Sequence, residues 1–390
     1  VVYTPAVGVS HPVFEQALDL GLPVLKRAEL LGQLSRTKRV VAVAGTHGKT
    51  SICAMLTHLL TATGMSVTAF IGGHSLNAEG HYLSGTSDWW VLEADEFDRS
   101  FHHLRPELAV ITSVDPDHLE IYGTEEVLLQ AFQQFAEFIQ PGGYLLLHES
   151  LKGRIRTPSS VQAALYGSAP DNSIRFRKLE QQAWVQRFKW DSPRSTLESA
   201  ELAVPGQHNL DNMGAALALA EEVWYRQEQT FPLALAWEGI RTYRGVRRRW
   251  EVLVEKPDLV VVLDYAHHPK EIRAAIATAR ALFPKWPVEV VFQPHLYSRT
   301  QQLAAQFAQA LSAADRLYLT HIYPAREEPI SGVTCEIITP FLRQELPRSI
   351  LNLNQVLDDV AAAKTTPRIL LVLGAGDIDQ LAPDLIDRFS

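Results

Sequence analysis

The sequence predicts an α/β protein built on mostly parallel sheets in two or three domains. Short, continuous apolar runs alternate with amphipathic helical segments from residue 39 onwards, which is typical of parallel strands covered by helices on both faces. The first run, VVAVA at 40–44, leads directly into the turn GTHGKTS at 45–51. A Gly-Lys-Thr turn between a strand and a helix is typical of a phosphate-binding loop.

The first α/β run contains most of the helical and strand signals before residue 240. A helix at 49–60 is expected because Ile52, Met55 and Leu59 recur at helical spacing. The stretch 168–200 is polar and irregular, and we expect a small β region there. We also predict strands at 40–44, 65–73, 89–95, 108–114 and 144–148, a helix at 124–139, and a turn leading into a helix at 203–224.

A second α/β run follows the basic segment RGVRRRW at 244–250. Its predicted strands are 259–264, 288–293, 316–320 and 369–374, and its predicted helices lie near 270–282, 301–313 and 376–388. Before residue 37 the chain is expected to form a strand (VVYTPA), a helix, a strand-like LPVL and another helix. This beginning resembles the tail of an α/β domain whose front half is missing, so we expect domains at 1–37, 38–240 and 241–390.

Composition argues against several functional classes. The formal net charge is −8, from 36 basic and 44 acidic side chains, which disfavours nucleic-acid binding and offers no cationic face to a membrane. No apolar stretch approaches the roughly 18 residues that a membrane helix needs. The two cysteines, Cys53 and Cys335, cannot build a disulfide framework or a zinc cluster. We expect reduced thiols in a cytoplasmic protein.

The phosphate loop has the residues that its chemistry requires. Gly45 and Gly48 let the backbone approach phosphate oxygens, and N–H groups at the helix N-terminus point at the anion. Lys49 can reach the outer phosphates, and the hydroxyl of Thr50 can bind Mg²⁺. The loop is shorter than the usual pattern, because Val43 stands where the first glycine of G-x-x-x-x-G-K-[ST] would fall.

Polar clusters follow two further strands of the first run. In EADEFD at 93–98, Glu93 or Asp95 could supply the carboxylate that a magnesium nucleotide needs, although an acidic solvated loop fits the composition equally well. In DPDH at 115–118, His118 could be a metal ligand or an acid–base group, or a structural histidine. Its place beside other strand-end clusters favours the functional interpretation.

The remaining motifs lie around the start of the second run. In GQHNLDN at 206–212, His208 and Asn209 could bind a base edge, but a helix cap is favoured from the residues alone. RGVRRR at 244–249 is an anion site or a solvated basic run, with neither favoured. DYAHHP at 264–269, QPHLYSRT at 293–300 and GAGD at 374–377 end three strands of the second run.

Taken together, GTHGKTS, EADEFD, DPDH, GQHN, RGVRRR, DYAHHP, QPHLYSRT and GAGD resemble the Mur ligases, in that family's order and across residues 45–377. The resemblance implies a P-loop-type central ATPase domain, a Rossmann-like C-terminal domain and the remnant of a Rossmann-like N-terminal domain. The motifs most resemble those of members that join L-alanine to UDP-N-acetylmuramate, using ATP and Mg²⁺, as a monomer or homodimer.

The resemblance also implies roles for individual residues. The catalytic residues would be Lys49, His118, His268 and Arg299. The nucleotide would contact Gly45, Thr46, His47, Gly48, Lys49, Thr50, Ser51, His208, Asn209, Arg247, Arg248 and Asp264. Thr50, Glu93 and His118 would hold the metal. Tyr265, His267, His268, His295 and Arg299 would face the alanine and the muramoyl carboxylate.

The sequence departs from the family's pattern at three places. The glycine-rich UDP-binding turn is absent, which puts UDP-sugar binding by this chain in question. Leu296 stands where many relatives have an arginine after the histidine of the QPH motif. Because no lysine lies between 119 and 151, we expect no carbamylated lysine near the metal.

The expected reaction is formation of an acyl phosphate followed by attack of an amine. ATP would phosphorylate the muramate carboxylate, and Lys49 with Mg²⁺ would stabilise the charge on the transferred group. His267, His268 or His295 could take the proton of the amine. Rival interpretations are a ligase that recycles a tripeptide, a folylpolyglutamate synthetase-like enzyme, a nucleotide switch or motor, and a catalytically silent ATP-binding fragment.

Overall fold

The computed structural model describes residues 1–4, 7, 11–363 and 366–389. The chain forms two compact units. The first comprises Val1–Ala203 with Asn209–Gly245, and the second comprises Val204–His208 with Val246–Ser390. The predicted division at residues 37 and 240 stays a proposal.

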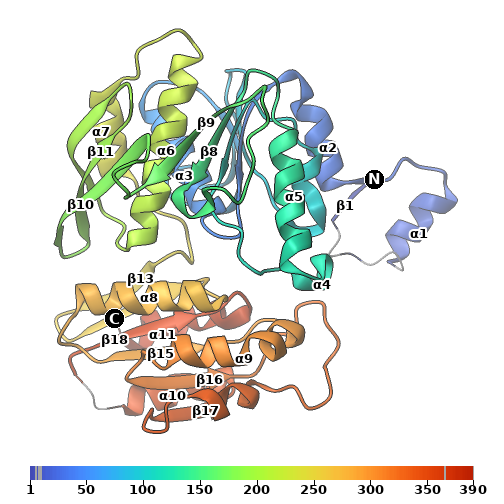
Figure 1. Ribbon diagram of the computed structural model, residues 1–390. Coiled ribbons are helices and arrows are strands. Elements are labelled where there is room, and N and C mark those ends of the chain that lie inside the picture. Colours follow the sequence, from blue (N-terminus) through green and yellow to red (C-terminus); the bar gives the residue numbers. More distant parts are fainter. Residues whose placement is uncertain (5–6, 8–10, 364–365, 390) are drawn as a thin grey trace. The chain divides into compact units, whose positions relative to one another are not determined.

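A mixed sheet forms the centre of the first unit (Figure 1). Among the described residues it has ten strands in the order β12-β11-β10-β9-β8-β7-β3-β6-β4-β5. Their bounds are β3 (Arg39–Ala44), β4 (Thr68–Ser75), β5 (Gly80–Leu83), β6 (Trp89–Glu93), β7 (Leu108–Ile111), β8 (Tyr144–His148), β9 (Gln162–Gly167), β10 (Ile174–Gln182), β11 (Val185–Asp191) and β12 (Thr196–Leu202). The central pairs are parallel, whereas β5, β11 and β12 pair antiparallel at the two edges.

The described residues of the first unit also form helices. They are α1 (Pro12–Asp19), α2 (Arg27–Leu34), α3 (Lys49–Ala62), α4 (Leu119–Tyr122), α5 (Glu125–Glu137), α6 (Gln207–Tyr225) and α7 (Leu233–Thr242), and a short strand pair joins β1 (Val2–Tyr3) to β2 (Leu25–Lys26). Val40 and Ala42 of β3 belong to the buried cluster that contains Phe132 and Phe135 of α5. Because strand side chains alternate, Val41 faces the opposite side of the sheet. The buried α3 lies along β4, β6 and α7.

The second unit is a parallel sheet with one antiparallel edge strand. Among its described residues the order is β13-β14-β18-β15-β16-β17, and only β13 is antiparallel to its neighbour. The strands are β13 (Glu251–Lys256), β14 (Leu259–Asp264), β15 (Val288–Phe292), β16 (Arg316–Thr320), β17 (Arg348–Leu351) and β18 (Arg368–Leu373). The helices are α8 (Pro269–Leu282), α9 (Tyr297–Leu311), α10 (Leu353–Ala362) and α11 (Leu381–Phe389).

The core of the second unit explains its layers. Val356 of α10 and Leu385 of α11 share one buried cluster with Val261 and Leu370 of the sheet. Helix α8 contacts α9, β15 and β18. Because β14 to β18 run parallel, their carboxyl ends lie at the same edge of the sheet. This edge is where α/β sheets place ligand-binding loops.

Most sequence-based element predictions are confirmed, but several elements were missed. The stretch 168–200 does form strands, within β10, β11 and β12. The prediction missed β5, β9, β13, β17, α4, α7 and α10, and the helix expected at 376–388 divides into a 3₁₀ segment at Asp377–Gln380 and α11. In VVYTPA, only Val2–Tyr3 is a strand, and residues 5 and 6 lie outside the described residues. No helix in the described part of the chain is long and apolar enough to cross a bilayer.

Candidate functional site

The loop between β3 and α3 can be built only with glycine at two positions. Gly48 has φ 82°, in the left-handed region that favours glycine, and directly precedes α3. A Cβ at Gly48 would lie 2.5 Å from Oδ1 of Asn212. A Cβ at Gly45 would collide with Oγ1 of Thr112 and lie 2.9 Å from its backbone nitrogen. The loop is therefore packed against β7 and α6 without room for larger residues.

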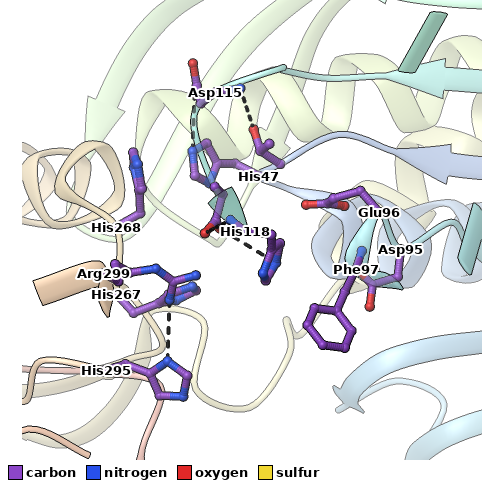
Figure 2. A network of polar contacts seen from close by, with 12 residues as sticks. His47, Asp95, Glu96, Phe97, Asp115, His118, His267, His268, His295 and Arg299 are labelled. Atoms are coloured by element: carbon purple, nitrogen blue, oxygen red, sulfur yellow. Dashed lines mark hydrogen bonds and ion pairs between the residues drawn. The ribbon is translucent and has the colours of Figure 1, made fainter. Parts of the chain in front are cut away.

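Hydrogen bonds fix the loop to the end of β7. Oγ1 of Thr46 lies 2.8 Å from Oγ of Ser113, and the backbone N–H of His47 donates to the same Oγ at 3.1 Å. The hydroxyl of Thr112 donates to the carbonyl of His47 at 2.5 Å. The side chain of His47 reaches Asp115, with Nε2 and Oδ2 3.2 Å apart (Figure 2). These contacts hold the loop rigid before any ligand binds.

Lys49 lies among carboxylates at the first residue of α3. Its Nζ is 2.6 Å from Oε2 of Glu96, 3.9 Å from Oδ1 of Asp95, and donates to the carbonyl of Gly45 at 2.8 Å. Burial opposes the charge, but the carboxylates of Glu96, Asp95 and Glu93 outweigh it and raise the pKa of Lys49. The ammonium therefore remains charged at neutral pH.

Thr50 and Glu93 form the second polar pair of this site. The hydroxyl of Thr50 donates to Oε1 of Glu93 at 3.1 Å, and the backbone of Gly72 donates to Oε2 at 2.8 Å. Burial raises the pKa of Glu93, although Lys49 lowers it in part. The carboxylates of Glu93, Asp95 and Glu96 all lie near the ammonium of Lys49, and burial also raises the pKa of Glu96.

The carboxylates of this cluster and the hydroxyl of Thr50 are oxygen ligands of the kind that Mg²⁺ prefers. Within the residues that the structure describes, no group of three or more His, Cys, Asp or Glu side chains is arranged to hold a metal. A cation here would therefore take its remaining ligands from phosphate oxygens and water, as Mg²⁺ does at other nucleotide sites.

His118 is oriented by its neighbours (Figure 2). Its backbone has φ 52°, and its N–H donates to Oδ1 of Asp117 at 2.8 Å. Its Nε2 lies 3.9 Å from Oδ2 of Asp117, and its ring packs edge-on against Phe97 at 5.3 Å between centroids. A left-handed backbone at a non-glycine residue is strained, and such strain clusters at functional sites.

The remaining predicted nucleotide residues of this region occupy buried or half-buried positions. Ser51 is buried in the first turn of α3. Asn209 is buried inside the first turn of α6, which begins at Gln207, so Asn209 is not the helix cap that its motif alone favours. His208 belongs to the second unit. Burial lowers the pKa of His208 to about 4.

In the second unit, the turn after β14 places two histidines at the start of α8. Nδ1 of His267 is 3.0 Å from the carbonyl of Tyr265 and 3.3 Å from Oε2 of Glu271. His268 is the N-cap residue of α8, and its Nδ1 accepts from the backbone N–H of Lys270 at 3.3 Å. Glu271 completes a capping box by accepting from the backbone N–H groups of both histidines.

The turn after β15 brings His295 and Arg299 together (Figure 2). Nη1 of Arg299 is 3.4 Å from Nδ1 of His295, and the arginine is only 5% exposed. Leu296, between them, has φ 69° and is buried. Glu327 caps α9, because Ser298 in the first turn of that helix donates to its carboxylate from the backbone at 3.0 Å and from the hydroxyl at 2.5 Å.

Three predicted nucleotide residues of the second unit differ in their surroundings. Arg248 binds Asp379 at 3.0 Å and also donates to the carbonyls of Gly374 and Gly376. Asp264 accepts from the backbone N–H groups of Trp250 and Ala266, each at 2.8 Å, and burial raises its pKa to about 6. Arg247 is exposed. Arg248 and Asp264 therefore tie strand ends together in this structure.

Comparison with known families accounts for both units. The Mur ligase middle domain matches residues 43–220, and the glutamate ligase domain of the Mur ligases matches residues 248–376. The chain belongs to the Mur ligase family. The first match includes the phosphate loop with Lys49, and the second includes the turns that carry His267 and Arg299.

Individual Mur ligases resemble the chain over nearly its full length. UDP-N-acetylmuramate–L-alanine ligase of Porphyromonas gingivalis is 40% identical over 98% of this chain and 82% of that relative. The enzyme of the same name from Phocaeicola vulgatus is 38% identical over 99% of this chain and 82% of its own length. The crystal structure of UDP-N-acetylmuramate-alanine ligase from Thermotoga maritima superposes with a TM-score of 0.80 at 26% identity, covering 100% of this chain and 84% of that one.

Sequence reasoning missed three carboxylates that organise this Mur ligase. Glu96 lies within EADEFD, whose composition does not show which carboxylate turns inward. Glu271 stands three residues after the N-cap His268, and that capping-box spacing could have revealed it. Glu327 comes from a loop far along the chain, and no local signal points to it.

Proposed function

We propose that this Mur ligase joins L-alanine to the carboxylate of UDP-N-acetylmuramate and converts ATP to ADP and phosphate. The observation that carries the proposal is the loop in which Lys49 and the Thr50–Glu93 pair gather at the start of α3. The substrate pair is supported by relatives of that name at 38–40% identity over 98–99% of the chain.

The reaction proceeds in two balanced steps. A carboxylate oxygen of the muramate attacks the γ-phosphorus, the bond from that phosphorus to the β,γ-bridging oxygen breaks, and ADP leaves. The neutral amine of alanine then attacks the acyl carbon. The bond between that carbon and the phosphorylated oxygen breaks, so phosphate leaves with one oxygen from the original carboxylate, and the amide nitrogen loses its proton.

In the first step the chain stabilises charge on the transferred group. The free backbone N–H groups at the N-terminus of α3 suit an anion, and Lys49, the first residue of that helix, adds a positive charge. Because the loop is already fixed by Ser113 and Thr112, little reorganisation is needed when the triphosphate binds.

We further propose that Thr50, Glu93 and His118 hold Mg²⁺. The carboxylates gathered around Lys49 support this assignment, and so does the hydrogen bond of 3.1 Å between Thr50 and Glu93, which brings two oxygen ligands together. When bound, the ion would shield the repulsion between the phosphate groups and the attacking carboxylate. The adenosine contacts assigned to His208, Asn209, Arg247, Arg248 and Asp264 also remain proposals.

The second unit supplies groups that suit a carboxylate and an amine. Arg299 is a buried cation beside His295, so we assign it to a substrate carboxylate, and we assign Tyr265 and His268, in the turn after β14, to the same substrates. We assign His267 as the base. Its Nδ1 is engaged by the carbonyl of Tyr265, which selects the tautomer whose Nε2 accepts a proton.

The proposal extends to the cellular location, the oligomeric state and the domain division of the enzyme. Because ATP and a UDP-sugar are cytoplasmic metabolites, we propose that the protein acts in the cytoplasm, as a monomer or homodimer. The three-domain division at 1–37, 38–240 and 241–390 belongs to the same proposal.

The test is the substrate dependence of ADP release by the full-length protein. We expect ADP release to require UDP-N-acetylmuramate and to rise strongly on addition of L-alanine, with equal amounts of ADP and amide product. A tripeptide that replaced alanine with equal or greater efficiency would indicate the recycling ligase instead. ATP turnover that ignored both substrates would overturn the ligase assignment.

A further inference from the structure

Glu96 is an internal carboxylate of the first unit whose position is tightly held. It follows β6 at the start of the 3₁₀ segment Phe97–His103 and has an exposed fraction of 0%. The hydroxyl of Tyr122 donates to its backbone carbonyl at 2.5 Å, and the N–H of Arg99 donates to the same oxygen at 2.9 Å. Its side chain therefore enters the site from a fixed backbone.

The two oxygens of this carboxylate have different surroundings. Oε2 contacts Nζ of Lys49 at 2.6 Å, whereas Oε1 is buried and has no hydrogen-bond partner among the described residues. Leaving a buried carboxylate oxygen without a donor is costly, and such exceptions call for a specific explanation. A donor that arrives with a ligand would remove the cost.

The contact with Glu96 also determines where Lys49 lies. The same ammonium donates to the carbonyl of Gly45 at 2.8 Å, so the side chain is folded back over its own loop. The other nearby carboxylate, Asp95, is 3.9 Å away with a side chain 41% exposed, and is a weaker partner. Glu96 is thus the main anion that holds Lys49 at the loop.

We propose that Glu96 is a positioning residue that holds the charged Lys49 at the loop until the triphosphate replaces it, while its Oε1 accepts a donor that enters with the nucleotide. This inference rests on the proposed function, because it assigns Lys49 to the phosphates of ATP. Positioning of the Lys49 ammonium requires the negative charge of Glu96 and not merely the volume of the Glu96 side chain.

Two substitutions separate charge from volume. Glu96→Gln keeps the size of the side chain and removes its charge, whereas Glu96→Asp keeps the charge and shortens the side chain by one methylene. We expect Glu96→Gln to lower kcat by about tenfold and Glu96→Asp by about threefold, because a charge-assisted hydrogen bond is about twice as strong as a neutral one. KM for ATP should not rise in Glu96→Gln, since the removed charge also repels the phosphates.

The matched control is Glu107→Gln, which makes the same change at another largely buried carboxylate. Glu107 pairs with Arg39 at 2.6 Å at the start of β7 and contacts no residue of the phosphate loop in the described structure. We expect Glu107→Gln to lower the melting temperature of the protein and to leave kcat unchanged. If Glu96→Gln does not fold, Tyr122→Phe loosens the backbone of Glu96 without altering charge and should lower kcat about twofold.

Activity is followed as alanine-dependent ADP release, with melting temperatures recorded in parallel. The proposal is overturned if Glu96→Gln retains as much kcat as Glu96→Asp, if KM for ATP rises as far as kcat falls, or if Tyr122→Phe, used in its place, has no effect. These results would leave the ligase assignment intact. A wild-type protein without alanine-dependent ADP release would instead overturn the proposed function and this inference with it.

Discussion

The polar clusters at the strand ends of the two units differ in how well their charges are balanced. In the first unit, Glu93, Asp95 and Glu96 surround the single ammonium of Lys49, and one carboxylate oxygen of Glu96 has no partner among the described residues. Such a cluster is incomplete without further positive charge and hydrogen-bond donors. We infer that it is built for a magnesium triphosphate.

In the second unit the carboxylates near the strand ends are paired within the protein, although Nε of Arg248 and Nε of Arg368 are buried without a hydrogen-bond partner among the described residues. Glu271 caps α8 beneath His267 and His268, Glu327 caps α9 beside Arg299, and Asp379 binds Arg248. These groups are held in fixed positions before any substrate binds. We therefore expect changes around Lys49 in the first unit to act mainly on the chemical step, and changes around Arg299 in the second unit to act mainly on substrate affinity.

The largest effect should follow loss of the loop cation. We expect Lys49→Met to lower kcat about a thousandfold, because a preorganised charge opposite the transferred group is removed. The control is Lys38→Met, since Lys38 pairs with Asp88 at 2.9 Å outside the loop. Steady-state ADP release measures both. A Lys49→Met enzyme within tenfold of wild type would remove the distinction between the two clusters.

A somewhat smaller effect should come from the proposed metal carboxylate. We expect Glu93→Gln to lower activity between about tenfold and a hundredfold and to raise the Mg²⁺ concentration needed for half-maximal activity. The gain in melting temperature on adding Mg²⁺ with ADP should also shrink. Exposed Glu137 provides the control Glu137→Gln. An unchanged Mg²⁺ requirement in Glu93→Gln would contradict the metal assignment.

A change in the second unit should affect affinity for the amino acid. Glu327→Gln weakens the cap of α9, whose first residues include Arg299, so KM for alanine should rise about three- to tenfold while kcat changes little. The neighbouring Glu328→Gln alters an exposed carboxylate and should leave KM unchanged. If kcat fell and KM stayed constant, the contrast between the two units would be wrong.

The last prediction concerns the pH dependence of stability. Because burial lowers the pKa of His208 from 6.5 to about 4, its contribution to stability is complete above pH 6.5 and is lost as pH falls toward 4. His208→Gln should therefore reduce the slope of the unfolding free energy in that window by up to about 1.4 kcal/mol per pH unit. Urea denaturation at several pH values measures this slope. His81→Gln, at an exposed histidine, should not change it.

The sequence was most informative where structure and chemistry are local. The phosphate loop was predicted because strand, glycines, Lys49 and helix follow one another within a few residues, and the structure confirms that order. Fully buried parallel strands such as β7 and β14 were predicted for the same reason, since each is a continuous apolar run. Edge strands such as β5 and β13 lack such runs and were missed.

Partners that meet only in the folded chain could not be predicted. The sequence placed carboxylates after β6, but only the fold shows that Glu96 contacts Lys49. The guanidinium of Arg248 meets Asp379 and the carbonyl of Gly374 more than a hundred residues away. The basic motif at 244–249 therefore could not show that Arg248 forms hydrogen bonds inside the protein, because its partners are distant in the sequence.

The central claim, that the γ-phosphoryl group passes to the muramate carboxylate, is tested most directly by oxygen isotope transfer. UDP-N-acetylmuramate labelled with ¹⁸O in its carboxylate is incubated with the full-length protein, ATP and L-alanine, and the released phosphate is examined by mass spectrometry. Our account predicts one ¹⁸O atom in each phosphate formed with the amide. Unlabelled phosphate released at the same rate would show transfer to water and would contradict it.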